Sequence, residues 1–389
     1  MKKILCFLIA ITLCAAFVSE VFARESDNKS DAVAAGADFT VDAKSAILMD
    51  AGTGKILFSQ NENESASPAS VTKIMTLLLV MEALEDGRIS ASDNVVISGY
   101  AASMGGSQVF LEEGEVMKVE ELVKCAVIAS ANDAAVALAE HVGGSEKIFV
   151  GMMNKRAEEL GMKNTNFENV TGLDDTTENH VTSALDIAIM SRELIKYPLV
   201  LKYSSLWQDT IRGGEFTLTN TNRLVRYYDG CNGLKTGSTD KAGYCISATA
   251  KRDGMQLIAV IMGSPTRDIR NSAARSLLDY GFSNYAIYSS ETGAIENVPV
   301  YKGNKNQTTV YSSEFSAVIP KKELKKVEKI FEIPEYLTAP VSDGEAVGKI
   351  TYKLGDEILG SSDIYVSENI NKISFFDLFK NILENIFVN

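Results

Sequence analysis

The architecture of this chain follows from residues 67–84, which read SPASVTKIMTLLLVMEAL. From residue 69 onward the segment is apolar almost all round, a composition typical of a helix buried on every side. Serine followed by proline is a common helix start, so we expect Ser67 as the N-cap and Pro68 as the first helical residue. The chain has 389 residues, enough for a domain that encloses such a helix and for a second domain.

Ser70 and Lys73 are three residues apart at the start of this helix and therefore share one of its faces. Serine is a weak nucleophile that needs an adjacent base, and a lysine can be that base when burial and a neighbouring cation lower its pKa. Ser70 also falls in the first turn, where free backbone N–H groups can face an oxyanion. The pair predicts a nucleophile and its base, although Ser-x-x-Lys alone is a weak signal that also occurs at residues 26 and 238.

A second candidate triplet is Ser130-Ala131-Asn132, which interrupts the apolar run over residues 125–129. A hydroxyl and an amide placed between buried helices can relay a proton and hold a substrate amide. A helix cap is the ordinary interpretation of such a serine, and other Ser-x-Asn triplets occur in the chain, the literal Ser-Asp-Asn at residue 92 among them. The position of this triplet inside an apolar region makes it the better candidate.

The third triplet, Lys235-Thr236-Gly237, occurs once and falls on a predicted strand. The lysine can bind a substrate carboxylate, and glycine at the third position permits close approach of a ligand. The N–H of Ser238 then becomes a candidate for the second oxyanion donor. A triplet of this composition is ordinarily an exposed turn, so its meaning depends on the other two.

The remaining pattern predicts mixed helices and strands. We expect two hairpins, two further helical segments and a closing helix, and after these a small all-β domain of short alternating segments separated by polar turns. The ranges are, in that order, 46–59 and 243–262, 119–141 and 183–194, 270–280, and 292–368.

Both ends of the chain carry their own signals. Residues 1–23 have a basic start, an apolar run and a small-residue cleavage site, which predicts a secretory signal peptide and an exported protein. Residues 24–40 are rich in Ser, Asp, Ala and Gly and predict a disordered leader. Residues 371–389 predict an amphipathic helix with four Phe on its apolar face, which we interpret as a membrane anchor, with packing on a protein core as the alternative.

Composition excludes several classes of function. The formal net charge is −13 and there is no basic cluster, which argues against nucleic-acid binding. The chain has two histidines and no His-Glu-x-x-His, so we expect neither a metal nor another cofactor. Cys125 and Cys245 lie in apolar stretches and are interpreted as small buried hydrophobes. His180 is interpreted as a loop-fixing residue, and a Ser-His-Asp hydrolase is disfavoured because Ser70 lacks a Gly-x-Ser-x-Gly context.

The three motifs together, Ser70 to Lys73 and the two triplets, in this order resemble the serine penicillin-recognising enzymes, and within them the D-alanyl-D-alanine carboxypeptidases of the low-molecular-mass penicillin-binding proteins. The likeness covers about residues 40–285 and is most detailed over residues 68–76, 129–135 and 235–244. It implies an α/β (α+β) fold, a β-lactamase/transpeptidase-like domain over residues 41–288 with an antiparallel sheet flanked by helices. The all-β domain and the terminal helix fit the layout of the family.

The resemblance also implies roles for the site residues. Ser70 would attack the D-Ala-D-Ala amide of peptidoglycan stem peptides with Lys73 as general base, and Ser130 would pass the proton to the leaving D-alanine. Asn132 would hold the peptide, and Lys235 and Thr236 would hold the terminal carboxylate. Gly237 and Ser238 complete the substrate-binding set. Arg270 would assist with the carboxylate, with a surface helix arginine as the alternative. β-Lactam antibiotics would act as covalent inhibitors of an enzyme at the outer face of the cytoplasmic membrane, or secreted.

Three alternatives stay open at this stage. A β-lactamase shares the motifs but needs a glutamate near the acyl-serine, and Glu168 stands in a context, Glu168-Asn169-Val170-Thr171-Gly172-Leu173, that resembles the carboxypeptidases. A non-catalytic peptidoglycan-binding protein of the same fold would be expected to lack Ser70, Lys73 or Lys235. Endopeptidase action on cross-links would use the same residues as carboxypeptidase action. The sequence does not distinguish a vegetative from a developmental role.

Overall fold

The structure is a computed structural model that describes residues 39–175, 177–375 and 379. The predicted signal peptide, all but the last two residues of the predicted leader, and most of the predicted terminal helix lie outside the described residues. Within the described part of the chain, no helix is long and apolar enough to cross a membrane.

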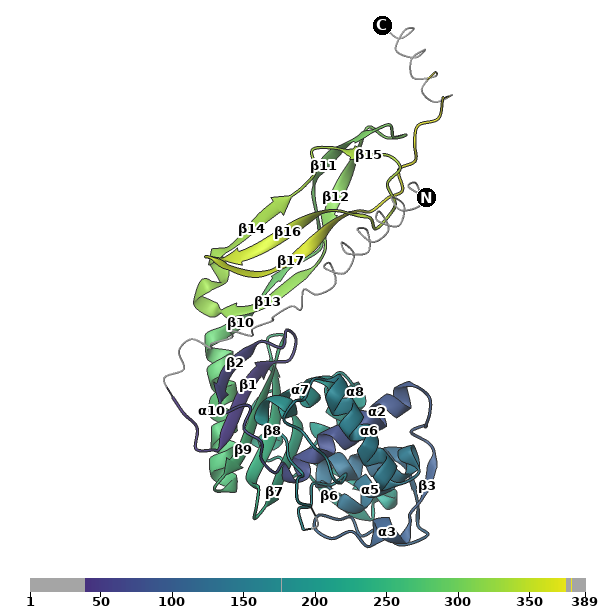
Figure 1. Ribbon diagram of the computed structural model, residues 1–389, viewed down its shortest axis with the longest axis vertical. Helices are drawn as coiled ribbons and strands as arrows, with labels where there is room; N and C mark the ends of the chain where they lie inside the picture. The colour runs from purple at the N-terminus through teal and green to yellow at the C-terminus, as the bar shows by residue number, and fades with distance from the viewer. Residues whose placement is uncertain (1–38, 176, 376–378, 380–389) are drawn as a thin grey trace, which may run out of the picture. The chain divides into compact units, whose positions relative to one another are not determined.

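An antiparallel sheet of five strands forms the centre of the first domain, in the order β2-β1-β9-β8-β7 (Figure 1). The two predicted hairpins are confirmed: β1 pairs with β2 through Ala46 and Gln60, and β8 pairs with β9 through Ala248 and Ala259. β7 forms one edge of the sheet. The strands are β1 (Ser45–Asp50), β2 (Ile56–Gln60), β7 (Cys231–Thr239), β8 (Gly243–Arg252) and β9 (Met255–Ser264).

Alternating side chains of these strands enter two different cores, because successive residues of a strand point to opposite faces. On β1, Ala46 and Leu48 pack with helix α10 (Arg267–Asn284), whereas Ile47 and Met49 pack with the helical region on the other face. Figure 1 shows α10 on one side of β8 and β9 and the other helices on the opposite side. The predicted antiparallel sheet flanked by helices is confirmed.

The helical region is built around α2 (Lys73–Glu85), whose side chains are buried at ten of thirteen positions, as its all-round apolar sequence predicts. The helices that share its core are α3 (Gly99–Ala102), α4 (Val119–Lys124), α5 (Asn132–Gly143), α6 (Glu146–Glu159), α7 (Ala184–Leu194) and α8 (Pro198–Ser204). The short helix α9 (Leu224–Tyr227) lies next to β7 and buries Leu224 in the core on the α10 face. Two small hairpins complete the region, β3 (Asn94–Val96) with β4 (Val116–Lys118) and β5 (Gln208–Ile211) with β6 (Phe216–Thr219), the latter joined through the 3₁₀ turn η3 (Arg212–Gly214).

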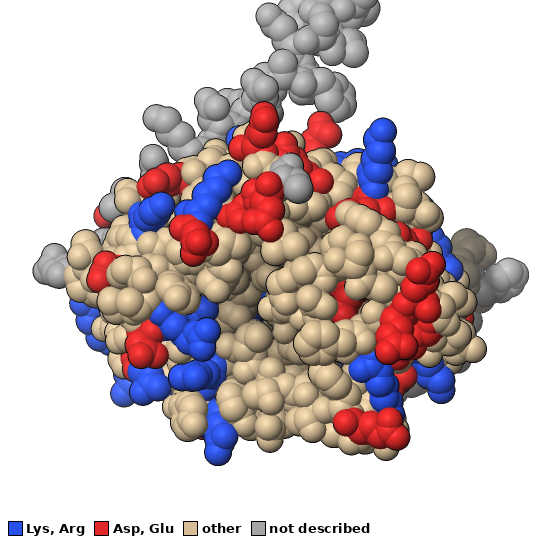
Figure 2. Space-filling model, turned by 90° about the horizontal axis from the view of Figure 1, so that it is seen from below, with Lys and Arg blue, Asp and Glu red and all other residues tan. Residues whose placement is uncertain are grey.

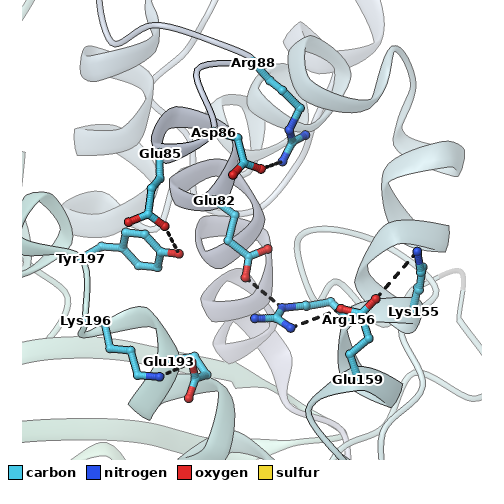
Figure 3. Close-up of polar contacts among 10 residues, drawn as sticks. All are labelled: Glu82, Glu85, Asp86, Arg88, Lys155, Arg156, Glu159, Glu193, Lys196 and Tyr197. Atoms are coloured by element: carbon cyan, nitrogen blue, oxygen red, sulfur yellow. Dashed lines mark hydrogen bonds and ion pairs between the residues drawn. The ribbon is translucent and has the colours of Figure 1, made fainter. Parts of the chain in front are cut away.

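Ion pairs hold the C-terminal half of α2 to its neighbours (Figure 3). Glu82 on α2 accepts a hydrogen bond from Arg156 Nε on α6 at 2.8 Å, and Arg156 also reaches Glu159 at 3.2 Å. Tyr197 donates its hydroxyl to Glu85 at 3.2 Å. These contacts hold the far end of the helix whose first residue is Lys73.

The start of this helix differs from the prediction. A 3₁₀ turn, η1 (Ala69–Thr72), precedes α2, its N-cap is Pro68, and no side chain caps it. The predicted Ser67 cap is therefore wrong. Ala69 adopts a φ of +47°, outside the usual range for a residue with a side chain. The cause is tertiary, because the backbone of Gly172 and that of Gly237 press against this turn. Ser70 nevertheless lies in the first turn, as predicted.

The predicted continuous helix over residues 119–141 is also divided. After α4 comes a π-helical turn, η2 (Cys125–Ala129), and then Ser130 with a φ of +62°, before α5 begins at Asn132. π-Turns of this kind are frequent at functional sites, because they redirect a side chain that a regular helix would place elsewhere. Here the break sets Ser130 and Asn132 at the junction of two helices.

The second domain is all-β, as predicted. A six-stranded sheet in the order β14-β16-β17-β12-β11-β15 and a separate pair, β10 with β13, enclose a core that includes Val310, Tyr352 and Ile364. The strands are β10 (Tyr285–Ser290), β11 (Gly293–Tyr301), β12 (Gln307–Ser312), β13 (Phe315–Pro320), β14 (Val327–Glu332), β15 (Leu337–Thr338), β16 (Ala346–Leu354) and β17 (Glu357–Val366), with a 3₁₀ turn η4 (Lys321–Lys326).

Candidate active site

A cavity of about 450 Å³ opens between the edge strand β7 and the helical region, a volume typical of small-molecule sites. The predicted residues in its lining are Ser70, Ser130, Thr236, Gly237, Ser238 and Arg270, and the lining residues that were not predicted are Ser107, Trp207, Thr219, Asn220, Thr221, Arg223 and Arg267. Figure 2 shows the hollowed face from below, with basic side chains gathered along one side of it and acidic side chains on the other. Six predicted residues that are far apart in sequence therefore meet at one cavity. The other three, Lys73, Asn132 and Lys235, do not line it: they are buried, and Lys73 and Lys235 contact the lining residues Ser70 and Ser130.

The Ser70 hydroxyl and the Lys73 amine are neighbours, as their spacing predicts. Lys73 Nζ lies 3.1 Å from Ser70 Oγ, 2.5 Å from Asn132 Oδ1 and 2.9 Å from the carbonyl oxygen of Thr171. A charged amine donates three hydrogens and satisfies all three oxygens. A neutral amine donates two, to Asn132 and Thr171, and its lone pair then faces the Ser70 hydroxyl. The site is thus built to accept a proton from the serine.

Electrostatics favours the neutral amine. Lys73 is fully buried, and this burial, with a smaller contribution from the charge of Lys235, lowers the pKa of Lys73 well below the ordinary lysine value. Asp133 acts in the opposite direction. The Asp133 carboxylate is itself held by the backbone N–H groups of Val109 and Leu111, both at 3.1 Å.

Ser130 is joined to the third motif. Lys235 Nζ donates to Ser130 Oγ at 2.8 Å and to the carbonyl oxygen of Thr236 at 2.8 Å. Lys235 is 1 % exposed, and burial followed by the charge of Arg270 lowers its pKa to about 7. Ser130 is also the C-cap of η2, through its left-handed backbone and its own N–H, so the ordinary interpretation as a helix cap holds for its backbone. Its hydroxyl caps no helix and accepts from Lys235 instead.

The structure explains the glycine at position 237 differently from the expectation, which was that it permits close approach of a ligand. A β-carbon at this position would lie 2.8 Å from the Ser70 nitrogen and 2.8 Å from the Pro68 carbonyl oxygen. The glycine therefore allows β7 to approach η1 itself, the turn over Ala69–Thr72 that carries the candidate nucleophile Ser70 and is called the nucleophile turn below. This contact brings the Ser238 and Ser70 residues of the two segments to the same wall of the cavity.

Arginines make the far end of the cavity positive. Arg270 is 3 % exposed and its guanidinium is held by Asn271 Oδ1 at 2.8 Å and by the Cys245 carbonyl oxygen at 3.4 Å. Burial and the charge of Arg267 lower the pKa of Arg270 to about 10, so it stays charged at neutral pH. The alternative that Arg270 is a surface arginine is therefore wrong. Together with Arg223 and Arg267 it forms the basic part of the lining.

Two predicted substrate contacts have partners within the protein. Thr236 Oγ1 donates to Thr221 Oγ1 at 2.8 Å. Asn132 Nδ2 donates to the Gly105 carbonyl oxygen at 2.7 Å, while its oxygen accepts from Lys73, and the side chain is buried. Asn132 thus positions Lys73, and one Nδ2 hydrogen is left over. Its role in holding a substrate amide stays a prediction.

The contacts of Glu168 lie within its own loop. Its Oε2 accepts from the backbone N–H groups of Glu178 and Asn179 at 3.0 and 3.1 Å, and its own N–H donates to His180. The carboxylate closes a surface loop, so the interpretation of Glu168 as a structural residue agrees with its contacts. The same contacts agree with the interpretation of His180 as a loop-fixing residue.

Sequence reasoning missed the turn that supports Lys73. Asn169 Oδ1 accepts from the N–H of Thr171 at 3.1 Å and from that of Gly172 at 2.7 Å, and this turn directs the Thr171 carbonyl at Lys73. An asparagine followed two residues later by Thr-Gly is the local signal of such a turn. Its partner Lys73, however, is 98 residues away in sequence, which no local pattern reveals.

Comparison with known proteins agrees with this arrangement. Residues 31–266 match the family model of D-alanyl-D-alanine carboxypeptidases, and residues 282–372 match that of the C-terminal domain of penicillin-binding protein 5. A D-alanyl-D-alanine carboxypeptidase of Bacillus subtilis is 41% identical over 98% of this chain and 97% of its own length. The crystal structure of penicillin-binding protein 5 from Haemophilus influenzae matches with a TM-score of 0.74 and 33% identity, covering 86% of this chain and 99% of that one.

Two further structures place the likeness in the same group. That of penicillin-binding protein 3 from Streptococcus pneumoniae matches with a TM-score of 0.73 and 31% identity, over 86% of this chain and all of that one. The ampicillin-bound form of penicillin-binding protein D2 from Listeria monocytogenes matches with a TM-score of 0.59 and 30% identity, over 64% of this chain and all of that one. By sequence over almost its whole length and by fold, this chain belongs to the D-alanyl-D-alanine carboxypeptidase family.

Proposed function

We propose that the protein is a serine-type D-alanyl-D-alanine carboxypeptidase that removes the terminal D-alanine from peptidoglycan stem pentapeptides through an acyl-enzyme on Ser70. The observation that carries this proposal is the Ser70 hydroxyl on the wall of the cavity, 3.1 Å from the buried amine of Lys73. A non-catalytic wall-binding protein would have no need of a buried lysine aimed at a serine, since burial of an amine carries a desolvation cost.

Acylation begins with the attack of Ser70 Oγ on the carbonyl carbon of the penultimate D-alanine. The proton of the hydroxyl moves to the neutral Lys73 amine, which is held in place by Asn132 and Thr171. The carbonyl oxygen becomes an oxyanion and accepts hydrogen bonds from the backbone N–H groups of Ser70 and Ser238. Such preorganised backbone donors contribute about 10²- to 10³-fold each to rates of this kind.

Collapse of the tetrahedral intermediate expels D-alanine, whose amine needs a proton. Ser130 relays the proton that Lys73 took from Ser70: its hydroxyl gives one proton to the amine and takes one back from the protonated Lys73. The hydrogen bond from Lys235 holds the Ser130 hydroxyl on the cavity wall. Lys235 and Thr236 bind the terminal carboxylate of the substrate, and the positive field of Arg270 supports them. A free carboxylate next to the scissile bond is what distinguishes a carboxypeptidase substrate, and this end of the cavity is cationic.

Water then hydrolyses the acyl-enzyme. β-Lactams acylate Ser70 in the same way and then stay bound, so they act as covalent inhibitors. This agrees with the ampicillin- and cefotaxime-bound structures of the relative from Listeria monocytogenes. A β-lactamase requires a base at the acyl-serine for rapid release. The carboxylate of Glu168 is bound to the backbone of its own loop, so that second candidate lacks a supporting contact.

We place the enzyme outside the cytoplasmic membrane, at its outer face or secreted. The support is the sequence of the two ends, with the signal pattern over residues 1–23 and the apolar face predicted for residues 371–389. Deletion of residues 371–389 is expected to release the protein from the membrane fraction. Retention of the shortened protein, once cleavage of the signal is verified, contradicts the anchor.

The activity is tested with purified protein in two parallel measurements. Intact-protein mass spectrometry after benzylpenicillin is expected to show a long-lived adduct on Ser70, and a diacyl-Lys-D-Ala-D-Ala peptide is expected to release D-alanine. Rapid penicillin turnover without peptide cleavage would identify a β-lactamase instead. Absence of both adduct and product would identify a binding protein.

A further inference from the structure

A series of three hydrogen bonds runs beneath the nucleophile turn, outside the lining of the cavity. Glu168 N lies 3.0 Å from His180 Nδ1, His180 Nε2 lies 2.8 Å from Thr72 Oγ1, and Thr72 Oγ1 lies 2.8 Å from the carbonyl oxygen of Ala69. His180 is 1 % exposed and Thr72 is fully buried, so water does not compete for these groups. The series ends one residue before Ser70.

The direction of every bond in the series is determined. The backbone N–H of Glu168 can only donate, so His180 Nδ1 is the acceptor and carries no hydrogen. A neutral imidazole has one hydrogen, which must then be on Nε2. His180 Nε2–H therefore donates to Thr72 Oγ1, and the single hydrogen of the Thr72 hydroxyl is left for the carbonyl oxygen of Ala69. A threonine without the histidine would be free to rotate this hydrogen elsewhere.

The carbonyl that receives this bond belongs to a backbone unit that needs support. Ala69 has a φ of +47°, an unfavourable conformation for a residue with a side chain, which persists only when the surroundings hold it. Its carbonyl and the N–H of Ser70 are parts of one planar trans peptide group and point in opposite directions. Whatever fixes the Ala69 oxygen therefore also fixes the direction of the Ser70 N–H, toward the side where β7 and Gly237 lie.

From this geometry we propose that His180 is a positioning residue, which acts through the Thr72 hydroxyl and the Ala69 carbonyl to aim the Ser70 N–H at the oxyanion. This inference rests on the proposed function, because it assigns a purpose to the same nucleophile turn. It adds a residue that has no contact with the cavity, and it assigns Thr72, inside the first motif, to the support of the oxyanion site.

The first test replaces the hydroxyl alone. Thr72→Val keeps the shape of the side chain and removes the bond to Ala69, whereas Thr72→Ser keeps the hydroxyl. Benzylpenicillin acylation is followed at rising concentrations, which separates the saturating rate constant from the half-saturation concentration. Thr72→Val is expected to lower the saturating rate constant about tenfold or more, since loss of a complete oxyanion donor costs about 10²- to 10³-fold. The half-saturation concentration should stay within about twofold, and Thr72→Ser should restore most of the rate.

A matched control removes an equally buried hydroxyl elsewhere in the domain. Thr249 is fully buried on β8, its hydroxyl has Asn232 as partner at 2.8 Å, and it does not line the cavity. The Thr249→Val protein should show the wild-type saturating rate constant for benzylpenicillin acylation, counted for the fraction of protein that forms the adduct. Acylation of Thr72→Val within about threefold of this control would overturn the proposal, as would an equal loss in Thr72→Val and Thr72→Ser.

The second test asks whether His180 acts through Thr72. His180→Leu should slow acylation in the wild-type background and have little further effect when Thr72→Val is already present, because the path is then broken. Effects that multiply in the double variant would overturn the role of the histidine. If the wild-type protein neither forms the adduct nor releases D-alanine, the proposed function fails. If the wild type does both and the Thr72 variants match it, only the positioning role fails.

Discussion

The close contact between Gly172 and the nucleophile turn leads to a sharp prediction for Gly172→Ala. A β-carbon at this position would lie 1.8 Å from the carbonyl oxygen of Ala69 and 2.7 Å from Thr72 Oγ1. Since contacts of a β-carbon under 3.0 Å essentially do not occur, the 1.8 Å approach must open by about 1.2 Å. The neighbour is backbone, so the shift is transmitted to Ser70, whose oxygen is 3.1 Å from Lys73 Nζ.

A misplacement of about 1 Å at a reacting group costs on the order of 100-fold in rate, which corresponds to about 2.7 kcal/mol of activation free energy. We therefore expect the second-order rate constant for benzylpenicillin acylation of Gly172→Ala to fall about 100-fold. The substitution also places an alanine at a φ of +82°, which lowers the free energy of unfolding by about 1 kcal/mol or more. Stopped-flow acylation and urea unfolding measure the two effects separately.

Gly161→Ala is the matched control. Gly161 has a φ of +72° and nothing within 4 Å of its potential β-carbon, so the substitution has the same conformational cost without the clash. It should lower the free energy of unfolding by the conformational cost alone, about 1 kcal/mol, and keep the wild-type acylation rate. A Gly172→Ala protein that is folded and acylates within about threefold of Gly161→Ala would show that the nucleophile turn does not depend on this contact.

Three further outcomes follow from the structure. Gly237→Ala should slow acylation at least tenfold, because its β-carbon would lie 2.8 Å from the Ser70 nitrogen; single-turnover rates check this, and an unchanged rate contradicts it. The kcat/KM for a D-Ala-D-Ala peptide should fall as pH rises through about 7. Burial lowers the pKa of Lys235 to about 7, and above this pH the neutral amine no longer attracts the substrate carboxylate. A kcat/KM that stays constant from about pH 6 to 9 would contradict this prediction. Burial lowers the pKa of His180 to about 4; the charges of Glu168 and Asp174 act to raise this pKa, and the charge of Lys241 acts to lower it. The folded state therefore disfavours protonation of His180. The stability associated with neutral His180 should be complete above about pH 6.5 and decline toward pH 4 by up to about 3 kcal/mol; urea unfolding across this range should show a smaller decline in His180→Leu than in the wild type.

Much of the local structure, and the contact between Ser70 and Lys73, could be predicted from the sequence. The spacing of Ser70 and Lys73 predicts their contact, because a helical turn places residues three apart on one face. The hairpins and the buried helix α2 follow from hydrophobic pattern and turn residues within one short segment. These features depend on interactions between near neighbours in the chain, and the amino-acid types determine such interactions directly.

The tertiary structure decided how these groups work together. Lys235 meets Ser130 across 105 residues. Lys73 owes its lowered pKa to burial and to Lys235, and neither can be seen in the four-residue motif that contains it. The turn at Ala69 and the break at Ser130 override local helix preference, because glycine backbones press on the first and the second lies at the junction of two packed helices. A contact between distant segments depends on the path of the whole chain, so the sequence names the catalytic groups while the packing sets their distances and their charges.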